Sequence, residues 1–196
     1  MDGDRPGLLE QAPWVKRHKL DVHGYYRMGE AGIFADGERV ELIEGEIIDM
    51  APIGSEHSAA VSSLIMGLAA SVAGRALVWA QNPLRLSDTN EPQPDFMLLT
   101  PRADGYRNGH PTPADVLLLI EVSQTSLSYD RKVKLPLYAR HGVPEVWIVN
   151  IGDSVVEVYR DPKDDAYQTI THATRGDTLE PAALPGVRIA VDGVIG

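Results

Sequence analysis

The sequence contains no cysteine among its 196 residues. Disulfide bonds, thiolate zinc sites and cysteine nucleophiles are therefore excluded, and the absence suits a reducing cytoplasm. Long apolar runs are also missing, because no stretch approaches the roughly 18 consecutive apolar residues of a membrane-spanning helix. Residues 1–20 are polar and charged and lack the apolar core of a secretory signal. We therefore expect a cytoplasmic protein that does not enter a membrane.

Common catalytic fingerprints are absent as well. The sequence holds no P-loop, no GxGxxG fingerprint, no GxSxG elbow and no HExxH motif. Its six histidines are scattered without metal-binding spacing, and no serine has the sequence context of a nucleophile. Nothing in the sequence points to an organic cofactor.

Positive charge is scarce, since 18 Lys and Arg residues face 28 Asp and Glu residues and the formal net charge is −10. Long-range repulsion therefore opposes tight, non-specific binding to nucleic acid. Two local basic groups remain, which are as often plain solvated surface as binding sites. The first is Arg131, Lys132, Lys134 and Arg140, and the second is Arg102, Arg107 and His110.

No repeat, low-complexity segment or Pro/Gly-rich linker divides the chain. We therefore predict a loosely attached leader over residues 1–20, followed by one domain over residues 21–196. Helices are predicted over 22–31, over about 128–141, and from an N-cap at Ser55 to about residue 73. Residues 40–50 alternate in polarity and turn at Gly45, which predicts a hairpin.

Strand patterns occupy much of the remaining sequence. They cover residues 76–86, 94–99, 115–122, 146–150, 155–159, 166–172 and 187–194. The segment 115–122 (DVLLLIEV) is nearly all aliphatic, which is typical of a central strand buried on both faces. The order of elements predicts an α/β (α+β) fold, with a mixed central β-sheet flanked by helices and an N-terminal β-hairpin extension.

Three residues stand out because each breaks a local rule. Asp95 opens an apolar strand, Glu121 follows five aliphatic residues, and Lys134 lies near the start of the next helix. A carboxylate at the end of a buried strand is costly unless it is paired, protonated or bound to a cation. Simpler interpretations stay open: Asp95 could cap a turn, Glu121 could pair with Arg85, and Lys134 could be a surface lysine.

Together these three residues have a shared chemical logic. Two carboxylates on neighbouring strand ends can share a hard divalent cation, and Mg²⁺ usually takes one or two carboxylates together with water and substrate phosphate. Such a metal lowers the pKa of a bound water and neutralises phosphate charge. A nearby lysine can orient that water or stabilise negative charge in the transition state. Asp95 and Glu121 are thus the predicted metal ligands.

The order helix, strand, Pro94-Asp95, strand with Glu121, helix resembles the PD-(D/E)XK restriction-endonuclease-like fold. That pattern places its lysine two residues after the second acid, where this sequence has Ser123. The stretch IEVSQTSLSYDRKVKLPLYARHGVPEVWIVN closely resembles the Uma endonuclease family, a domain catalogued as of unknown function. The segments ERVELIEGEIIDMAPIGSEHS and PQPDF resemble it too. The similarity covers roughly residues 22–195.

The resemblance implies that the lysine has moved onto the following helix, at Lys134, with Lys132 as a nearby substitute. The spacing i, i+4, i+8 places Asp130, Lys134 and Tyr138 on one helix face. Pro136 conflicts with this helix, because proline removes a backbone donor and favours a kink or a late start.

Further site residues are expected near these. The resemblance implies a further residue from the first helix, often an acid or glutamine in nucleases of the fold, and Glu56 or His57 occupies the first turn of that helix here. His57 also matches a recurrent position of the family, although a capping role is an alternative. Alternation in the 40–50 segment places Glu41 on the side of Ile43 and Ile47, so Glu41 is a further candidate acid or a structural ion-pair partner.

The resemblance implies a Mg²⁺- or Mn²⁺-dependent endonuclease that hydrolyses phosphodiester bonds in DNA and acts as a homodimer. One alternative is a nuclease-like fold without catalysis that binds proteins, which the acidic net charge and the displaced lysine favour. Another is a small metal hydrolase with a different phosphate or ester substrate. An active nuclease requires Asp95, Glu121 and Lys134 to converge on one metal-sized space, whereas a binding module leaves them separated or salt-bridged.

Overall fold

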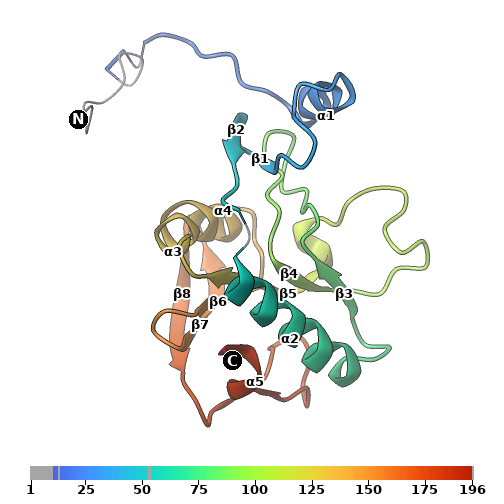
Figure 1. The fold of residues 1–196 in the computed structure, drawn as a ribbon, viewed down its shortest axis with the longest axis vertical. Helices are drawn as coiled ribbons and strands as arrows, with labels where there is room; N and C mark the ends of the chain where they lie inside the picture. Colours follow the sequence, from blue (N-terminus) through green and yellow to red (C-terminus); the bar gives the residue numbers. More distant parts are fainter. Residues whose placement is uncertain (1–10, 13, 53, 196) are drawn as a thin grey trace.

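A six-stranded mixed sheet forms the centre of the computed structural model, which describes residues 11–12, 14–52 and 54–195 (Figure 1). Most of the predicted leader, residues 1–10 and 13, and the final residue 196 lie outside the described residues. The strands are β3 (Leu77–Ala80), β4 (Phe96–Leu99), β5 (Val116–Ser123), β6 (Glu145–Asn150), β7 (Val155–Lys163) and β8 (Ala166–Ala173). They lie side by side in chain order, and only β5 and β6 run parallel.

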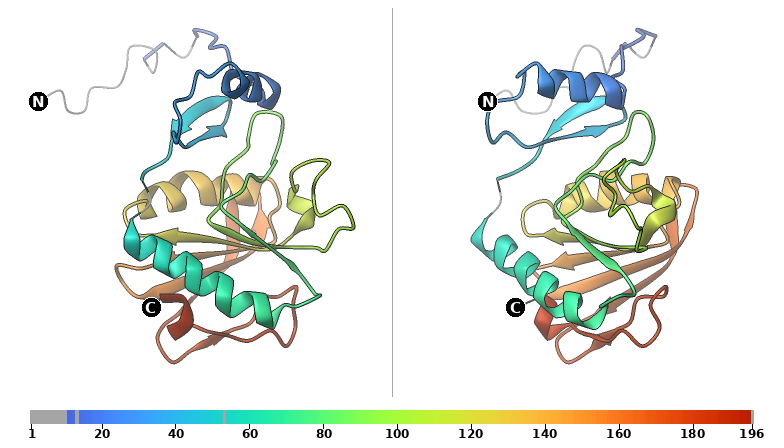
Figure 2. Two further views of the ribbon diagram at one scale, coloured as in Figure 1. Left: turned by 45° about the vertical axis from the view of Figure 1, so that its right-hand side comes forward. Right: turned by 90° about the vertical axis from the view of Figure 1, so that its right-hand side faces the viewer.

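A parallel pair needs a crossover connection, and here that connection is helical. It consists of α3 (Leu127–Tyr129), the π turn η2 (Asp130–Lys134) and α4 (Leu135–Arg140). This crossover covers one face of the sheet, while α2 (Ser55–Ser71) and α5 (Asp192–Ile195) cover the other (Figure 2). The predicted mixed sheet flanked by helices is therefore confirmed.

The two faces of the central strand β5 divide the core. Leu118, Ile120 and Val122 pack in the cluster that contains α2, whereas Leu119 packs in the cluster that contains α4. Because side chains alternate between faces, Glu121 shares the face of Leu119 and therefore points toward the crossover. This alternation decides which helix can supply a partner for the carboxylate.

The predicted N-terminal hairpin is formed by β1 (Val40–Ile43) and β2 (Glu46–Asp49), and α1 (Val22–Glu30) lies beside it. Its turn residues Glu44 and Gly45 have φ values of +50° and +75°, as a two-residue turn with two left-handed positions requires. One expectation was wrong: Ile47 pairs with Leu42 and shares its face, not that of Glu41. The reason is that the turn pairs residue 43 with 46, which reverses odd and even positions between the strands.

Gly45 should be the least replaceable residue of this turn. A Cβ atom there would lie 2.7 Å from the Cβ of Lys19 and 3.0 Å from the carbonyl oxygen of Leu20. We expect Gly45→Ala to lower the free energy of unfolding by about 3 kcal/mol, from backbone strain together with this clash. The matched control is Gly37→Ala, where φ is +82° but nothing lies within 4 Å. Its loss should be about 1–2 kcal/mol in denaturant titrations, and equal losses would contradict the role of the clash.

Several predicted boundaries were wrong. Ser55 is the first residue of α2, and Gly54 is its N-cap without a side-chain hydrogen bond. The strand predicted over 76–86 ends at Ala80, because Gln81 turns the chain with a φ of +52°.

The strand predicted over 187–194 was also wrong. It is reduced to β10 (Ile189–Ala190), paired only with the short β9 (Thr178–Leu179), and α5 follows. Val187, Ile189 and Val191 are buried at every second position, as in a strand, which explains the error. Among the described residues, no helix is both long and apolar enough to cross a membrane.

Candidate active site

Asp95 and Glu121 lie next to each other at one end of the sheet. β4 and β5 pair antiparallel with Phe96 opposite Ile120, so the residues one step beyond, Asp95 and Glu121, lie on the same face. The backbone N–H of Asp95 donates to Glu121 Oε2 at 3.3 Å. The backbone N–H of Val122 donates in turn to Asp95 Oδ2 at 2.9 Å. The backbone therefore holds both carboxylates in place.

Lys134 points inward from the crossover to meet them. Its side chain is only 6% exposed, and Nζ lies 3.2 Å from Glu121 Oε1 and 3.4 Å from Glu41 Oε2. The interpretation of Lys134 as a surface lysine was wrong. The alternative pairing of Glu121 with Arg85 was also wrong, because Arg85 forms an ion pair with the buried Glu91.

A π turn resolves the conflict that Pro136 raised. The backbone N–H of Leu135 donates to the carbonyl of Asp130, five residues earlier, so the helix is wider here than an α-helix. Pro136 then occupies the first turn of α4, where its missing N–H costs least. Asp130, Lys134 and Tyr138 all become buried on the sheet side, in agreement with their spacing.

Hydroxyl groups hold the buried acids in position. Tyr138 Oη donates to Glu121 Oε1 at 2.5 Å, and Tyr129 Oη donates to Glu41 Oε1 at 2.9 Å. Asp130 Oδ2 accepts hydrogen bonds from the hydroxyl of Ser126 at 2.6 Å and from that of Ser123. Tyr129 carried no signal in the sequence that could have assigned it to the site.

Two further predicted residues meet the same cluster. Glu41, which is 1% exposed, reaches it from β1 and also accepts the backbone N–H of Gln93 at 3.0 Å. His57 comes from the first turn of α2, and its Nε2 lies 2.9 Å from Asp95 Oδ1. Glu56, the alternative to His57, instead hydrogen-bonds the side chain of Gln124 outside this cluster.

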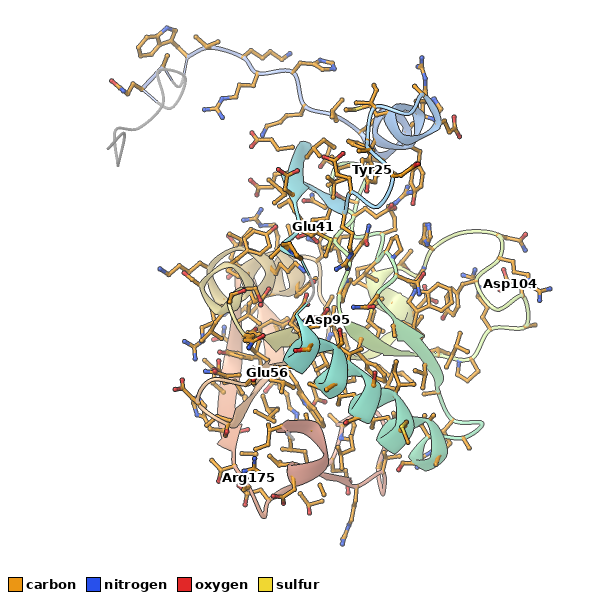
Figure 3. The ribbon with its side chains drawn as sticks, in the orientation of Figure 1. Tyr25, Glu41, Glu56, Asp95, Asp104 and Arg175 are labelled. Carbon is orange, nitrogen blue, oxygen red and sulfur yellow. The ribbon has the colours of Figure 1, made fainter. Side chains whose placement is uncertain are left out.

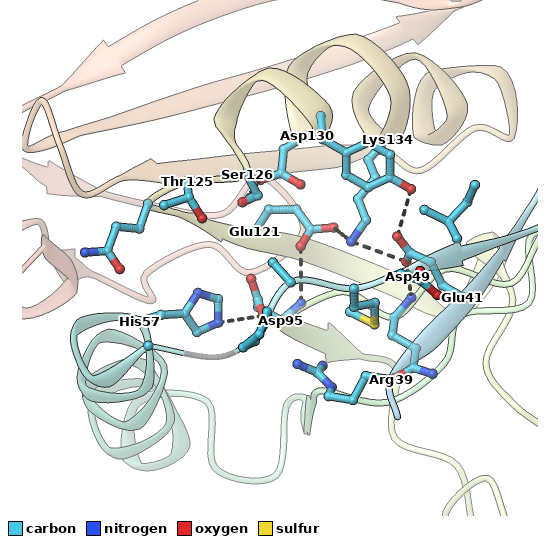
Figure 4. A pocket seen from close by; sticks show the side chains of 18 residues that line it. Arg39, Glu41, Asp49, His57, Asp95, Glu121, Thr125, Ser126, Asp130 and Lys134 are labelled. Carbon is cyan, nitrogen blue, oxygen red and sulfur yellow. Dashed lines mark hydrogen bonds and ion pairs between the residues drawn. The ribbon is translucent and has the colours of Figure 1, made fainter. Parts of the chain in front are cut away.

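These side chains line one pocket of about 260 Å³ between the hairpin, the N-terminus of α2 and the crossover (Figure 4). We call it the acidic pocket. Its described lining holds five carboxylates: Glu41, Asp49, Asp95, Glu121 and Asp130. The Lys and Arg residues that line it are Arg39 and Lys134. Negative charge therefore exceeds positive charge in the pocket.

Burial and neighbouring charges shift the pKa values of the ionisable side chains in the acidic pocket. Burial raises the pKa of Glu121 above its ordinary value, although the Lys134 ammonium opposes this shift. Burial alone would lower the pKa of Lys134, but the carboxylates of Glu121 and Glu41 raise it above its ordinary value. The hydrogen bond to Asp95 raises the pKa of His57, whereas burial and the charge of Arg39 oppose that rise. Lys134 therefore stays a cation at neutral pH.

The donor set suits a hard divalent cation of the kind that takes few protein ligands. Glu121 lies beside Asp95. A carboxylate offers about four lone-pair positions. Because each oxygen of Asp95 takes part in one hydrogen bond, each still has a lone pair available for a cation. No group of three or more His, Cys, Asp or Glu residues in the described part of the chain could enclose a metal ion. Asp95 and Glu121 provide two adjacent carboxylates, the number that Mg²⁺ usually takes together with water and phosphate.

Three arginines of the two basic groups are already paired with acidic residues. Arg131 pairs with the buried Glu157, and Arg140 pairs with both Glu44 and Asp165. In the second group, Arg102 pairs with Asp104, which projects on a loop away from the pocket (Figure 3). Arg39, by contrast, lines the acidic pocket and was missed, although it lies two residues before Glu41 and directly precedes β1.

Comparisons with known proteins identify the family and the fold. The profile of the Uma2 family, described as "Putative restriction endonuclease", matches residues 23–192. The crystal structure of "a putative nuclease belonging to DUF820 from Anabaena variabilis" has a TM-score of 0.68 and 18% identity, and the alignment covers 90% of this chain and 97% of that chain. At this identity the likeness shows the fold alone, and it confirms the predicted restriction-endonuclease-like core. No curated protein matches. Because the profile spans most of the sequence, the chain belongs to the Uma2 family.

Proposed function

We propose that the acidic pocket is the active site of an endonuclease that hydrolyses phosphodiester bonds of DNA and depends on Mg²⁺ or Mn²⁺. The observation that carries the proposal is the convergence of Asp95, Glu121 and Lys134, with Lys134 Nζ 3.2 Å from Glu121. Such a buried arrangement costs stability, because the attraction between buried charges often fails to offset the cost of removing them from water. A role in function would explain why the arrangement is kept. Membership in a family described as "Putative restriction endonuclease" supports the same conclusion.

Asp95 and Glu121 would hold the cation, which when bound supplies Lewis acidity toward the phosphate and lowers the pKa of a nearby water. Lys134 acts as a fixed positive charge and not as a proton acceptor, because its raised pKa keeps it protonated at neutral pH. Its ammonium would stabilise negative charge that develops on the phosphate. Glu41 positions Lys134, and His57 positions Asp95.

The second candidate function is a nuclease-like fold that binds another protein and has no catalysis. The observation in its favour is that Lys134 forms ion pairs with both Glu41 and Glu121, as a structural cluster would. The net charge of −10 points the same way. Metal binding at the pocket separates the two functions, since a structural ion-pair cluster needs no cation.

The test compares the purified protein with its Asp95→Asn variant. The unchanged protein should cleave plasmid or oligonucleotide DNA with Mg²⁺ or Mn²⁺, and EDTA should stop cleavage. Asp95→Asn should lower the rate at least about tenfold, because it removes one of two anionic ligands. Cleavage of RNA or of simple phosphate esters instead of DNA would reassign the substrate. Equal cleavage by both proteins would contradict the proposed site.

Light scattering on the same sample tests whether the protein is a homodimer, as we also propose. The exposed Ile170 on β8, an edge strand of the sheet, supports this assembly. A monomeric mass would remove it without affecting the proposed chemistry.

A further inference from the structure

We propose that Arg39 binds a phosphate group of the nucleic-acid substrate at the mouth of the acidic pocket. The inference deepens the proposed function and depends on it for the identity of the substrate. It assigns to Arg39 a contact with substrate, separate from the residues that would hold the cation.

The position of Arg39 follows from the hairpin. Arg39 directly precedes β1, and its carbonyl accepts the backbone N–H of Met50 at 2.9 Å, which closes the base of the hairpin. Side chains two residues apart in a strand point to the same side. Arg39 therefore points in the direction of Glu41, into the pocket, while remaining half-buried near solvent.

The guanidinium lies where a substrate would enter. In Figure 4, Arg39 reaches from the base of the hairpin toward the side of the pocket occupied by Asp95 and His57. Arg39, His57 and Asp95 all line this pocket. A phosphate approaching Asp95 and Glu121 would therefore pass close to this guanidinium.

The negative charge of the pocket opposes the binding of an anionic substrate, so a positively charged side chain is needed to contact the phosphate. Its described lining contains five carboxylates, which repel phosphate. The charge of Lys134 is shared with Glu41 and Glu121, so Lys134 alone does not offset the five carboxylates. Within the ranges that the structure describes, no ion pair or side-chain hydrogen bond joins Arg39 to another residue, in contrast to Arg131, Arg140 and Arg102. A free guanidinium presents a planar set of donors that suits two phosphate oxygens.

The test uses a signature that belongs to phosphate contacts. Each neutralised phosphate releases counterions, so the logarithm of the binding constant falls with the logarithm of salt concentration by about 0.7–0.9 per contact. We would titrate a fluorescent DNA oligonucleotide with the full chain at several NaCl concentrations, with Ca²⁺ in place of Mg²⁺, and check the oligonucleotide for cleavage. Arg39→Ala should reduce the slope by about 0.7–0.9 and weaken binding at least about tenfold at low salt.

Two further variants identify the cause. Arg39→Lys keeps the charge but loses the planar donors, so its slope should stay near that of the unchanged protein while its affinity falls in part. The matched control is Arg188→Ala, an exposed arginine before β10 and outside the pocket, which should change neither quantity. In Mg²⁺, Arg39→Ala should raise KM by a larger factor than it lowers kcat.

The outcomes separate this inference from the proposed function. An unchanged slope in Arg39→Ala, an equal change in Arg188→Ala, or no binding by the unchanged protein would overturn the role of Arg39. Binding with the expected slopes but no cleavage in Mg²⁺ or Mn²⁺ would support the phosphate contact and contradict the endonuclease. Cleavage that needs Asp95 but is indifferent to Arg39 would support the endonuclease and contradict the phosphate contact.

Discussion

Replacing Glu121 by Gln is expected to lower the rate of metal-dependent DNA cleavage by at least about 100-fold. A catalytic cation supplies several kcal/mol of transition-state stabilisation, and each 1.36 kcal/mol corresponds to a factor of about ten in rate. Gln has nearly the shape of Glu, and its single oxygen can still accept one of the two hydrogen bonds that Tyr138 and the backbone of Asp95 donate to Glu121. It removes the negative charge that a cation needs. Single-turnover cleavage and calorimetric titration with Mn²⁺ would measure both losses.

The chain offers a close control in Glu157. Like Glu121, it is 2% exposed and accepts a hydrogen bond from a tyrosine hydroxyl, here that of Tyr159 at 2.6 Å. Its cationic partner is Arg131, and it does not line the acidic pocket. We expect Glu157→Gln to leave cleavage within about threefold of normal. Full activity in Glu121→Gln, or equal losses in both variants, would show that the cation does not depend on Glu121.

Replacing Lys134 by Met should produce the largest loss of stability at the site. Met fills much the same space as the lysine stem but removes the ammonium, which leaves Glu41 and Glu121 buried without their shared cation. Breaking a buried ion pair in this way costs about 3–5 kcal/mol. Chemical denaturation at neutral pH would measure the change in the free energy of unfolding.

The double variant Lys134→Met with Glu41→Gln tests the cause of that loss. It removes one of the two unpaired charges, so it should recover part of the lost stability. Lys132→Met, on the exposed side of η2, should change stability by less than about 0.5 kcal/mol. If Lys134→Met were no less stable than the Lys132 variant, the ammonium would not be compensating the acids.

Much of the sheet could be predicted because its signals are local. The aliphatic run before Glu121 indicated a doubly buried strand, and the alternation around Gly45 indicated a hairpin, and both are present. The C-terminal region could not be predicted in the same way. Val191, Val194 and Ile195 are apolar in any short element, and only packing against α2 and β6 selects a helix there.

The candidate site was predictable where a residue violated a local rule. Glu121 and Lys134 stood out because charge is costly in the elements that carry them. The π turn could not be foreseen, because it depends on how Pro136 fits after the crossover has packed on the sheet. Arg39 was missed because an arginine just before a strand is ordinary. Only the structure distinguishes it from Arg131 and Arg140, which form ion pairs.

The alternation of β5 constrains how this sequence can change over evolution. Glu121 faces the crossover only because it lies an odd number of steps from Leu118 and Ile120, which face α2. Aliphatic residues in this strand can be exchanged for one another at modest cost. Inserting or deleting a single residue between Val116 and Glu121 would turn the carboxylate into the opposite core. Natural variants of the strand should therefore vary in composition while keeping its length.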